Sequence, residues 1–252
     1  MIKTILITGA SSGLGKALSE EYANKETHLY LTGRNKNNLN KVKEICQIKG
    51  AKVTTKIIDV RQKEELEKWI LKIKKLDLVI ANAGISAGTS GGPESDNQIT
   101  QIFDINVNGV LNTINPAIKI MQKQGLGQIA IMSSLAGFKG LPSSPAYSGS
   151  KSAVRTYGEG LRGALSKLGI KVNVICPGYI KTPMTDVNNF PMPFLMSPQK
   201  AAKIIKKGLE KNKSRIAFPF GLYFIVWLMT LISTKITDPI FARLPGKSQL
   251  QK

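Results

Sequence analysis

The chain has 252 residues, among which 36 Lys and Arg outweigh 16 Asp and Glu to give a formal net charge of +20. Arginines are few, and the lysines that supply most of this charge are not interleaved with aromatic side chains, which argues against a nucleic-acid-binding protein but leaves attraction to anionic lipid or an anionic substrate open. Two cysteines, Cys46 and Cys176, and one histidine, His28, provide neither a disulfide framework nor a metal-ligand cluster, so we expect both cysteines reduced and no metal.

The first predicted strand, residues 3–7, leads directly into a glycine-rich turn and then into an amphipathic helix. In this order Gly9 permits the tight turn, Gly13 lets a pyrophosphate approach the backbone, and Gly15 lets the helix pack closely against the strand. Phosphates would rest on the free N–H groups of the helix N-terminus. The start of the chain therefore predicts a dinucleotide site.

The second predicted strand, residues 28–32, ends at Gly33 and Arg34, where a dinucleotide-binding fold meets the adenosine ribose. An acidic residue here holds the 2′-hydroxyl of NAD, whereas an arginine favours the 2′-phosphate of NADP. Arg34 therefore predicts NADP(H) as the cofactor. Lys36 is more simply explained as a solvated surface charge.

Strands and helices alternate along the remaining chain, which is long enough for one α/β domain with a complete core. The pattern predicts a single Rossmann-like, doubly wound parallel sheet with helices on both faces. We expect a dinucleotide-binding catalytic domain over residues 1–218 and a hydrophobic, helical tail over residues 219–252. The first strand begins without a preceding charged and apolar leader, so we expect no secretory signal and a cytoplasmic protein.

Tyr147 and Lys151 lie four residues apart in a predicted helix, downstream of Ser134 at the end of an apolar strand. Residues four apart share one helix face, so the ammonium can favour the phenolate and bring the tyrosine pKa, ordinarily about 10, nearer to working pH. Such a tyrosine can exchange a proton with a carbonyl or alcohol oxygen. This spacing alone is common on helices, and it is the predicted nucleotide site that favours a catalytic role for the pair.

From about residue 4 to 218 the sequence resembles the short-chain dehydrogenase/reductase family through several motifs in the same order. The motifs are Thr8-Gly9-x-x-x-Gly13-x-Gly15, Asp59-Val60, Asn82-Ala83-Gly84, Asn106, Ser134, Tyr147-x-x-x-Lys151, Pro177-Gly178 and Thr182. The resemblance implies an enzyme that transfers hydride between NADP(H) and a carbonyl/alcohol pair without a metal. It also implies a homodimer or tetramer that pairs through helices over roughly residues 100–124 and 148–168.

The resemblance further implies roles for individual residues. Tyr147 would be the general acid/base, Lys151 would lower its pKa and hold the nicotinamide ribose, and Ser134 would orient the substrate oxygen. Asn106 would support a water chain from Lys151 to solvent. We prefer Ser134 to Ser133 because it lies thirteen residues before Tyr147, which is the family's usual separation.

The implied cofactor residues extend from the glycine turn to the loop after the predicted strand 172–176. Asp59 would face the adenine, Asn82 would contact the adenosine side, and Thr182 would reach the nicotinamide amide or the pyrophosphate. Asn82 also suits a structural role, as does Asn106, and Pro177-Gly178 is foremost a turn. The whole set is Gly9, Ser11, Ser12, Gly13, Leu14, Gly15, Arg34, Asp59, Val60, Asn82, Ala83, Gly84, Tyr147, Lys151, Pro177, Gly178, Ile180 and Thr182.

Residues 183–198 lie where the family has a variable flap over its active site. Between Thr182 and Pro198 there are three Met, two Phe and three Pro residues, an adaptable apolar set that suits an apolar or lipid-like substrate. Alternatively, these side chains only pack the flap against the rest of the domain and do not bind substrate. Two other functions also remain open: a reductase of small soluble ketones or aldehydes with a tail that forms a dimer interface, and a non-catalytic NADP-binding regulatory protein.

The tail begins with an apolar run, and no side chain from Ile216 to Thr234 is charged. That length approaches what a bilayer crossing requires, but Pro219 and Gly221 near its start and the predicted strand at residues 215–218 shorten it. Three fates remain open: peripheral contact with a membrane, burial in a subunit interface or over the substrate cleft, and a true span. Basic residues on both sides favour the first, namely Lys206, Lys207, Lys211, Lys213, Arg215, Lys235 and Arg243.

Overall fold

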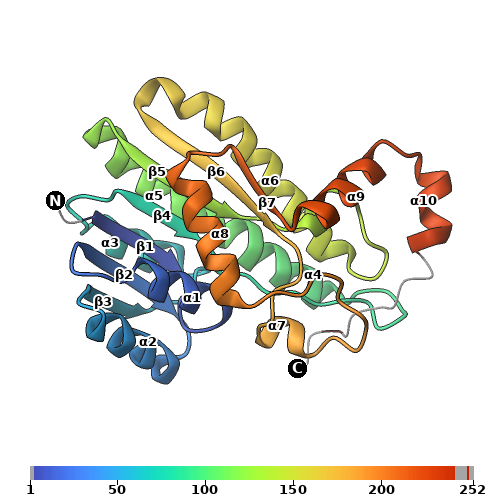
Figure 1. The fold of residues 1–252 in the computed structure, drawn as a ribbon, viewed down its shortest axis with the longest axis horizontal. Coiled ribbons are helices and arrows are strands. Elements are labelled where there is room, and N and C mark those ends of the chain that lie inside the picture. Colours follow the sequence, from blue (N-terminus) through green and yellow to red (C-terminus); the bar gives the residue numbers. More distant parts are fainter. Residues whose placement is uncertain (1–2, 242–248, 250–252) are drawn as a thin grey trace.

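The computed structural model describes residues 3–241 and residue 249, and its centre is one parallel sheet in the strand order β3-β2-β1-β4-β5-β6-β7 (Figure 1). The predicted doubly wound parallel sheet is confirmed. The strands are β1 (Lys3–Thr8), β2 (Thr27–Gly33), β3 (Lys52–Ile57), β4 (Leu78–Ala81), β5 (Gly127–Met132), β6 (Ile170–Pro177) and β7 (Arg215–Phe218).

Helices cover both faces of this sheet and bury a separate apolar cluster on each. The central strands are therefore continuous apolar runs, as in β4, where all four side chains are buried. One face carries α1 (Gly13–Tyr22), α2 (Lys36–Ile48) and α8 (Pro198–Glu210), and the other carries α3 (Lys63–Ile70), α4 (Asp96–Phe103), α5 (Gly109–Gln124) and α6 (Pro145–Leu165).

The sheet has its switch point at β1, which pairs with β2 on one side and with β4 on the other. In such sheets ligands bind outside the carboxyl ends of the strands at that point. The loops after β1, β4, β5 and β6 all leave from this edge, since every strand runs in the same direction. Motifs that are far apart in the sequence thus meet there.

The helix predicted over residues 100–124 is interrupted. Between α4 and α5 the chain forms one wide π-helical turn, Asp104–Asn108, which contains Asn106. The buried Asn106 side chain hydrogen-bonds the backbone of Ile85 and the hydroxyl of Ser150. Such tertiary contacts have no counterpart in local sequence periodicity, and π-turns often mark functional positions.

After the short helix α7 (Pro183–Asp186), the flap region returns to α8 through a bridge between Ile180 and Met196. Two helices follow β7, α9 (Phe220–Thr230) and α10 (Thr234–Phe241). Within residues 3–241, no helix combines the length and the apolarity needed to cross a membrane. The predicted basic flank residue Arg243 lies outside the described residues, and the predicted domain boundary at residue 218 stays a prediction.

Candidate active site

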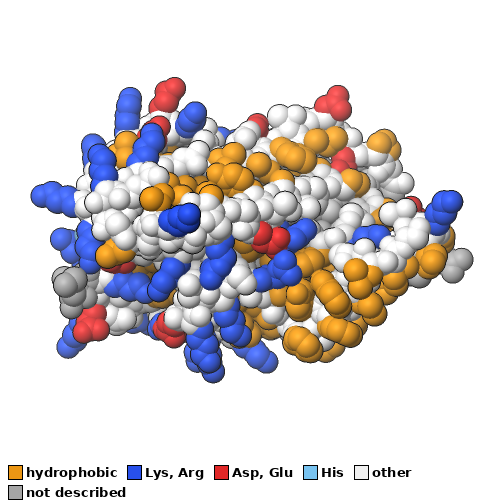
Figure 2. All heavy atoms as spheres, turned by 90° about the horizontal axis from the view of Figure 1, so that it is seen from above, with side chains coloured by type: hydrophobic (Ala, Val, Ile, Leu, Met, Phe, Trp, Pro, Cys, Tyr) orange, Lys and Arg blue, Asp and Glu red, His pale blue; other side chains and the backbone are white. Residues whose placement is uncertain are grey.

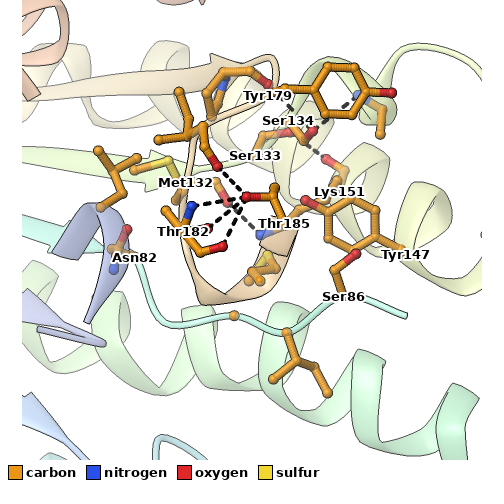
Figure 3. A pocket seen from close by; sticks show the side chains of 18 of the residues that line it. Asn82, Ser86, Met132, Ser133, Ser134, Tyr147, Lys151, Tyr179, Thr182 and Thr185 are labelled. Carbon is orange, nitrogen blue, oxygen red and sulfur yellow. Dashed lines mark hydrogen bonds between the residues drawn. The ribbon is translucent and has the colours of Figure 1, made fainter. Parts of the chain in front are cut away.

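A cavity of about 900 Å³ lies at the carboxyl edge of the sheet, beside the switch point. Every predicted cofactor-binding residue lines it, and so does Ser134. Figure 3 shows some of these side chains, among them Asn82, Tyr147 and Thr182. Asn106 is the predicted site residue that does not line the cavity, because it lies fully buried behind the wall. The fold thus brings the predicted cofactor-binding residues and the predicted catalytic residues Ser134, Tyr147 and Lys151 into one cavity.

The glycine turn adopts the backbone geometry that its sequence requires. Gly9 and Gly13 have φ angles of 66° and 52°, which side chains other than glycine rarely tolerate. A Cβ atom on Gly15 would lie 2.1 Å from the carbonyl oxygen of Gly9, so only glycine lets α1 approach the turn. A Cβ atom on Gly13 would lie 3.2 Å from Cγ2 of Thr182 and would narrow the space above the helix N-terminus. This space can receive a pyrophosphate.

Asn82 connects the end of β4 to this turn. Its Nδ2 donates to the carbonyl oxygens of Thr8 at 3.0 Å and Gly9 at 3.3 Å, and its backbone N–H donates to Oγ1 of Thr8 at 3.1 Å. The predicted structural role of Asn82 is therefore confirmed. Its side chain still lines the cavity.

Three charged side chains stand at the end of the cavity beyond β2 and β3. Asp59 accepts hydrogen bonds from Arg61, with its Oδ2 2.7 Å from Nη2, whereas Nη1 of Arg34 lies 3.8 Å from the same oxygen. Burial opposes ionisation of Asp59, but hydrogen bonds from Arg61 and the charges of Arg61 and Arg34 hold its pKa below the usual value. Asp59 thus neutralises one of two guanidinium groups, which leaves a net positive charge where Arg34 faces the cavity.

Ser134, Tyr147 and Lys151 meet at the opposite end. Ser134 follows β5, and its Oγ accepts the N–H of Ala136 at 3.1 Å and lies 3.5 Å from the carbonyl oxygen of Pro177. Tyr147 lies in the first turn of α6, and one turn later Nζ of Lys151 lies 5.9 Å from the centre of the tyrosine ring. A proton donor, a second hydroxyl and an amine therefore surround one position in the cavity (Figure 3).

The expected direction of the Tyr147 pKa is reversed in this structure. Burial raises the pKa of Tyr147, and the hydrogen bond with Ser134 opposes that rise without cancelling it. Burial also lowers the pKa of Lys151 to about 8. Nζ of Lys151 donates to the carbonyl oxygen of Met132 at 3.0 Å rather than to the phenol. Burial in low-polarity surroundings disfavours both the phenolate of Tyr147 and the ammonium of Lys151.

Asn106 shapes the wall behind Lys151. Its Oδ1 accepts the N–H of Ile85 at 2.8 Å, and its Nδ2 donates to the Ile85 carbonyl and to Oγ of Ser150 at 2.9 and 3.0 Å. A Cβ atom on Gly84 would lie 3.0 Å from Oδ1 of Asn106 and 3.3 Å from Nζ of Lys151, so both residues face the same glycine. The structural role is confirmed, and the water chain stays a prediction.

Ser133, the serine that was not preferred, donates from its Oγ to the backbone carbonyl of Lys151 at 2.8 Å. Cys46 and Cys176 are buried free thiols, as predicted, and burial raises the pKa of each to about 12. Within residues 3–241 and residue 249, no group of three His, Cys, Asp or Glu side chains could hold a metal ion.

The rest of the cavity is mostly apolar. The flap contributes Phe190, whose ring packs edge-on against Tyr179 with centroids 6.2 Å apart. The tail contributes a wall that sequence reasoning did not assign by residue: Leu222, Ile225, Val226 and Met229 of α9 and Phe241 of α10. The signal in the sequence for such a wall was the charge-free run from Ile216 to Thr234. Burial of this run over the substrate cleft was one of the alternatives left open, and the inner side of α9 lies there in the structure.

The cavity also suits a nicotinamide dinucleotide on chemical grounds. The backbone cradle at Gly9 and Gly13 leaves room for a pyrophosphate, and Arg34 adds positive charge near the position expected for the ribose. Within the flap, Asn188 lines the cavity, and its buried Oδ1 accepts no hydrogen bond from the described residues. A bound ligand with an N–H or O–H group could satisfy this oxygen.

Comparison with known proteins agrees with this geometry. The sequence model of a family described as short chain dehydrogenase matches residues 3–191. An uncharacterised oxidoreductase of Myxococcus xanthus is 33% identical over 246 residues, which cover 96% of this chain and 97% of the relative. A 3-oxoacyl-(acyl-carrier-protein) reductase of Rickettsia felis is 34% identical over 189 residues, which cover 74% of this chain and 76% of the relative.

Solved structures share the fold. A short-chain dehydrogenase from Sphingobium yanoikuyae in complex with NADPH superposes with a TM-score of 0.81 at 21% identity, and the match covers 97% of both chains. A short chain dehydrogenase from Mycobacterium paratuberculosis bound to NAD gives a TM-score of 0.75 at 23% identity, covering 85% of this chain and 94% of the other. Both cofactors therefore occur on this fold.

Proposed function

This chain belongs to the short-chain dehydrogenase family of oxidoreductases, and we propose that it transfers hydride between NADP(H) and the carbonyl/alcohol pair of an apolar substrate. The observation that carries the proposal is that Ser134, Tyr147 and Lys151 line the same cavity as the glycine turn, with Nζ of Lys151 5.9 Å from the centre of the Tyr147 ring. One cavity can therefore bind the cofactor and bring the proton donor to the same substrate.

The chain's own contribution to the reaction is to hold the substrate oxygen and to exchange its proton. NADPH, when bound, supplies hydride to the carbonyl carbon. Tyr147 gives its proton to the same carbonyl's oxygen, and Ser134 donates a hydrogen bond to that oxygen as negative charge develops. A tyrosine with a raised pKa is fully protonated at neutral pH, so it is ready to act as the acid in carbonyl reduction. Lys151 holds the nicotinamide ribose, and Asn106 supports a water chain behind it.

The preference for NADP(H) rests on the charge around Arg34. Asp59 is engaged by Arg61 at 2.7 Å and by Arg34 only at 3.8 Å, so Arg34 can bind a further anion. A 2′-phosphate is the anion that a nicotinamide dinucleotide presents there. We assign the glycine turn and Thr182 to the pyrophosphate and nicotinamide side, Asp59 and Val60 to the adenine, and Asn82 to the adenosine side.

The apolar character of the substrate follows from the flap and α9. Their side chains line the same cavity as Ser134 and Tyr147. The Rickettsia felis relative is named for a 3-oxoacyl substrate, which combines a ketone with an acyl chain, and this supports a chain-bearing ketone here. A largely apolar wall favours such a substrate over a small polar one.

The outer side of α9 suits peripheral contact with a membrane. Phe220, Phe224, Leu228 and Leu231 are exposed, with 75% of Phe220 and 67% of Leu231 accessible to solvent. Hydrophobic side chains gather at the end of the molecule that carries α9 and α10, while Lys and Arg cover the other end (Figure 2). We propose a cytoplasmic homo-oligomer, paired through α4, α5 and α6, that touches lipid through α9. Flotation with phosphatidylcholine vesicles tests the contact, and failure to float would contradict it.

Exchange of Tyr147 for Phe tests the enzymatic proposal. It removes one hydroxyl group, so NADPH affinity should stay nearly unchanged while turnover falls by about 10²- to 10⁴-fold. Tyr157→Phe is the matched control, because Tyr157 lies exposed on the same helix. Activity of Tyr147→Phe within about tenfold of the native protein would remove the proton-transfer assignment.

A further inference from the structure

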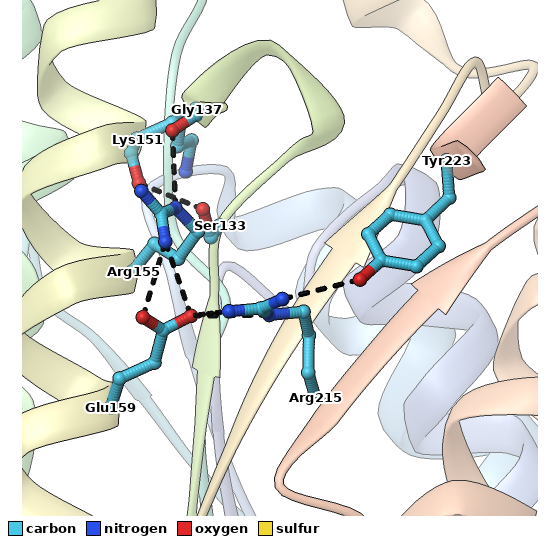
Figure 4. Close-up of polar contacts among 7 residues, drawn as sticks. All are labelled: Ser133, Gly137, Lys151, Arg155, Glu159, Arg215 and Tyr223. Carbon is cyan, nitrogen blue, oxygen red and sulfur yellow. Dashed lines mark hydrogen bonds and ion pairs between the residues drawn. The ribbon is translucent and has the colours of Figure 1, made fainter. Parts of the chain in front are cut away.

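A charged network fixes the first turn of α9 to the catalytic helix (Figure 4). Nη1 of Arg215, at the start of β7, donates to the hydroxyl of Tyr223 on α9 at 3.2 Å. Nε and Nη2 of the same guanidinium donate to Oε1 of Glu159 on α6. One arginine therefore joins α9 to α6, the helix that carries Tyr147.

The other half of the network reaches the loop that carries Ser134. Nη1 of Arg155 donates to both carboxylate oxygens of Glu159, at 3.1 and 3.2 Å, and its Nε donates to the carbonyl oxygen of Gly137 at 3.1 Å. A Cβ atom on Gly137 would lie 2.7 Å from the carbonyl carbon of Lys151, so this loop is packed directly on the backbone of α6. The network is thus continuous from the catalytic loop to the tail.

Phe138 lies at the centre of the same contacts. The guanidinium carbons of Arg155 and Arg215 are 4.7 and 5.2 Å from the centre of its ring, and the Tyr223 ring meets it edge-on at 5.6 Å. Both arginines are therefore held by stacking as well as by Glu159. Because Arg215 is fixed on several sides, its bond to Tyr223 fixes a defined point on α9.

The inner side of α9 otherwise contacts its surroundings through apolar side chains. Leu222 and Tyr223 pack on a small buried cluster that includes Leu135, and Leu222, Val226 and Met229 line the cavity. Apolar contacts are non-directional and permit a helix to rotate or slide. A hydrogen bond to a charged donor is directional and stronger than a neutral one. Just after the end of α9 there is a second polar contact, from Nζ of Lys139 to the carbonyl oxygen of Ile232 at 3.3 Å.

We propose that Tyr223 and Arg215 are positioning residues that hold α9 in register over the cavity, so that Leu222, Val226 and Met229 form a defined binding wall for the apolar chain of the substrate. The proposal rests on the proposed function for its substrate. Neither positioning residue touches the position of the reacting carbonyl. Their loss should therefore weaken binding of the chain and leave the chemical step intact.

Tyr223→Phe is the decisive variant, since it removes the hydroxyl and keeps the ring that packs on Phe138. With NADPH and a long ketone such as 2-dodecanone, KM should rise about tenfold while kcat stays within about twofold, because losing one hydrogen bond to a charged group corresponds to a factor of that order. With 2-butanone, which does not reach α9, both constants should stay unchanged. Arg215→Lys should keep part of the affinity for 2-dodecanone that Arg215→Met loses. Lysine retains the positive charge but lacks the several fixed N–H donors of the guanidinium group.

Hydrogen–deuterium exchange of the peptide over residues 220–232 gives a readout that does not depend on activity. Exchange should be about tenfold faster in Tyr223→Phe than in the native protein, and unchanged in the control Tyr157→Phe. Equal KM values for 2-dodecanone in native protein and Tyr223→Phe, together with unchanged exchange, would overturn the proposal. So would an equal loss with both ketones. If the native protein reduces no ketone, the proposed function fails, and the exchange rates still decide whether Tyr223 holds α9.

Discussion

Replacement of Lys151 by Met should stabilise the fold at neutral pH, although it removes a residue that we assign to the active site. Lys151 is 4% exposed, and burial lowers its pKa from 10.5 to about 8. That difference means that carrying the charge in the folded state costs about 3 kcal/mol at pH 7. Met avoids this cost but leaves the Met132 carbonyl without its 3.0 Å hydrogen bond, a loss of about 1 kcal/mol. The net gain is about 2 kcal/mol.

The pH dependence follows from the same two pKa values. Below pH 8 the lysine is charged in both states, so the penalty is fully present. Between pH 8 and 10.5 the folded state has lost the proton that the unfolded state still binds, so native stability rises with pH. The penalty falls to below about 1 kcal/mol at pH 10, and the advantage of Lys151→Met should disappear there.

Urea unfolding without cofactor, followed by circular dichroism at pH 7, 9 and 10, measures these differences. Other groups titrate alike in both proteins and cancel in the comparison. Lys167→Met is the control, because Lys167 is exposed in the 3-10 turn after α6 and should show no such gain. A Lys151→Met protein that is less stable than the native one at pH 7, or a stability difference that does not change with pH, would refute the reasoning.

Three further predictions concern the cofactor and the proton. Arg34→Asp should weaken NADPH much more than NADH in fluorescence titrations, and equal losses would contradict the 2′-phosphate assignment. Gly15→Ala places a methyl group 2.1 Å from the carbonyl oxygen of the glycine turn and should lower both NADPH affinity and Tm, whereas Gly163→Ala on α6, with open space around it, should change neither. Because burial raises the pKa of Tyr147, kcat/KM for ketone reduction should stay constant from about pH 6 to 9, while alcohol oxidation rises about tenfold per pH unit. An inflection of the reduction profile near pH 8 would indicate the neighbouring lysine instead.

Local sequence spacing was sufficient for the parts of the site that depend on a few consecutive residues. The turn from Gly9 to Gly15 needs glycine because of its own backbone angles and contacts, and the pair of Tyr147 and Lys151 needs only one helical turn. The order of strands and helices also predicted the sheet. Since parallel strands place their carboxyl ends on one edge, it followed that these motifs would meet.

The pKa values of Tyr147 and Lys151 could not be predicted from their spacing. Spacing correctly predicts that Tyr147 and Lys151 are neighbours, but burial and the Met132 carbonyl decide which charges the site tolerates. The π-turn at Asn106 is similar, because it depends on contacts with Ile85 and Ser150 from other parts of the chain. Desolvation depends on everything packed around a group and not on its own segment.

The tail shows the division most clearly. The sequence alone determined that the run from Ile216 to Thr234 is charge-free and must lie against something apolar. That its inner side forms a wall of the cavity became visible only in the folded chain, where Arg215 meets Glu159 and Tyr223 across three separate elements. The hydrophobicity of a residue depends on that residue alone and can be read from the sequence. The surface that covers it depends on how distant segments of the chain pack together.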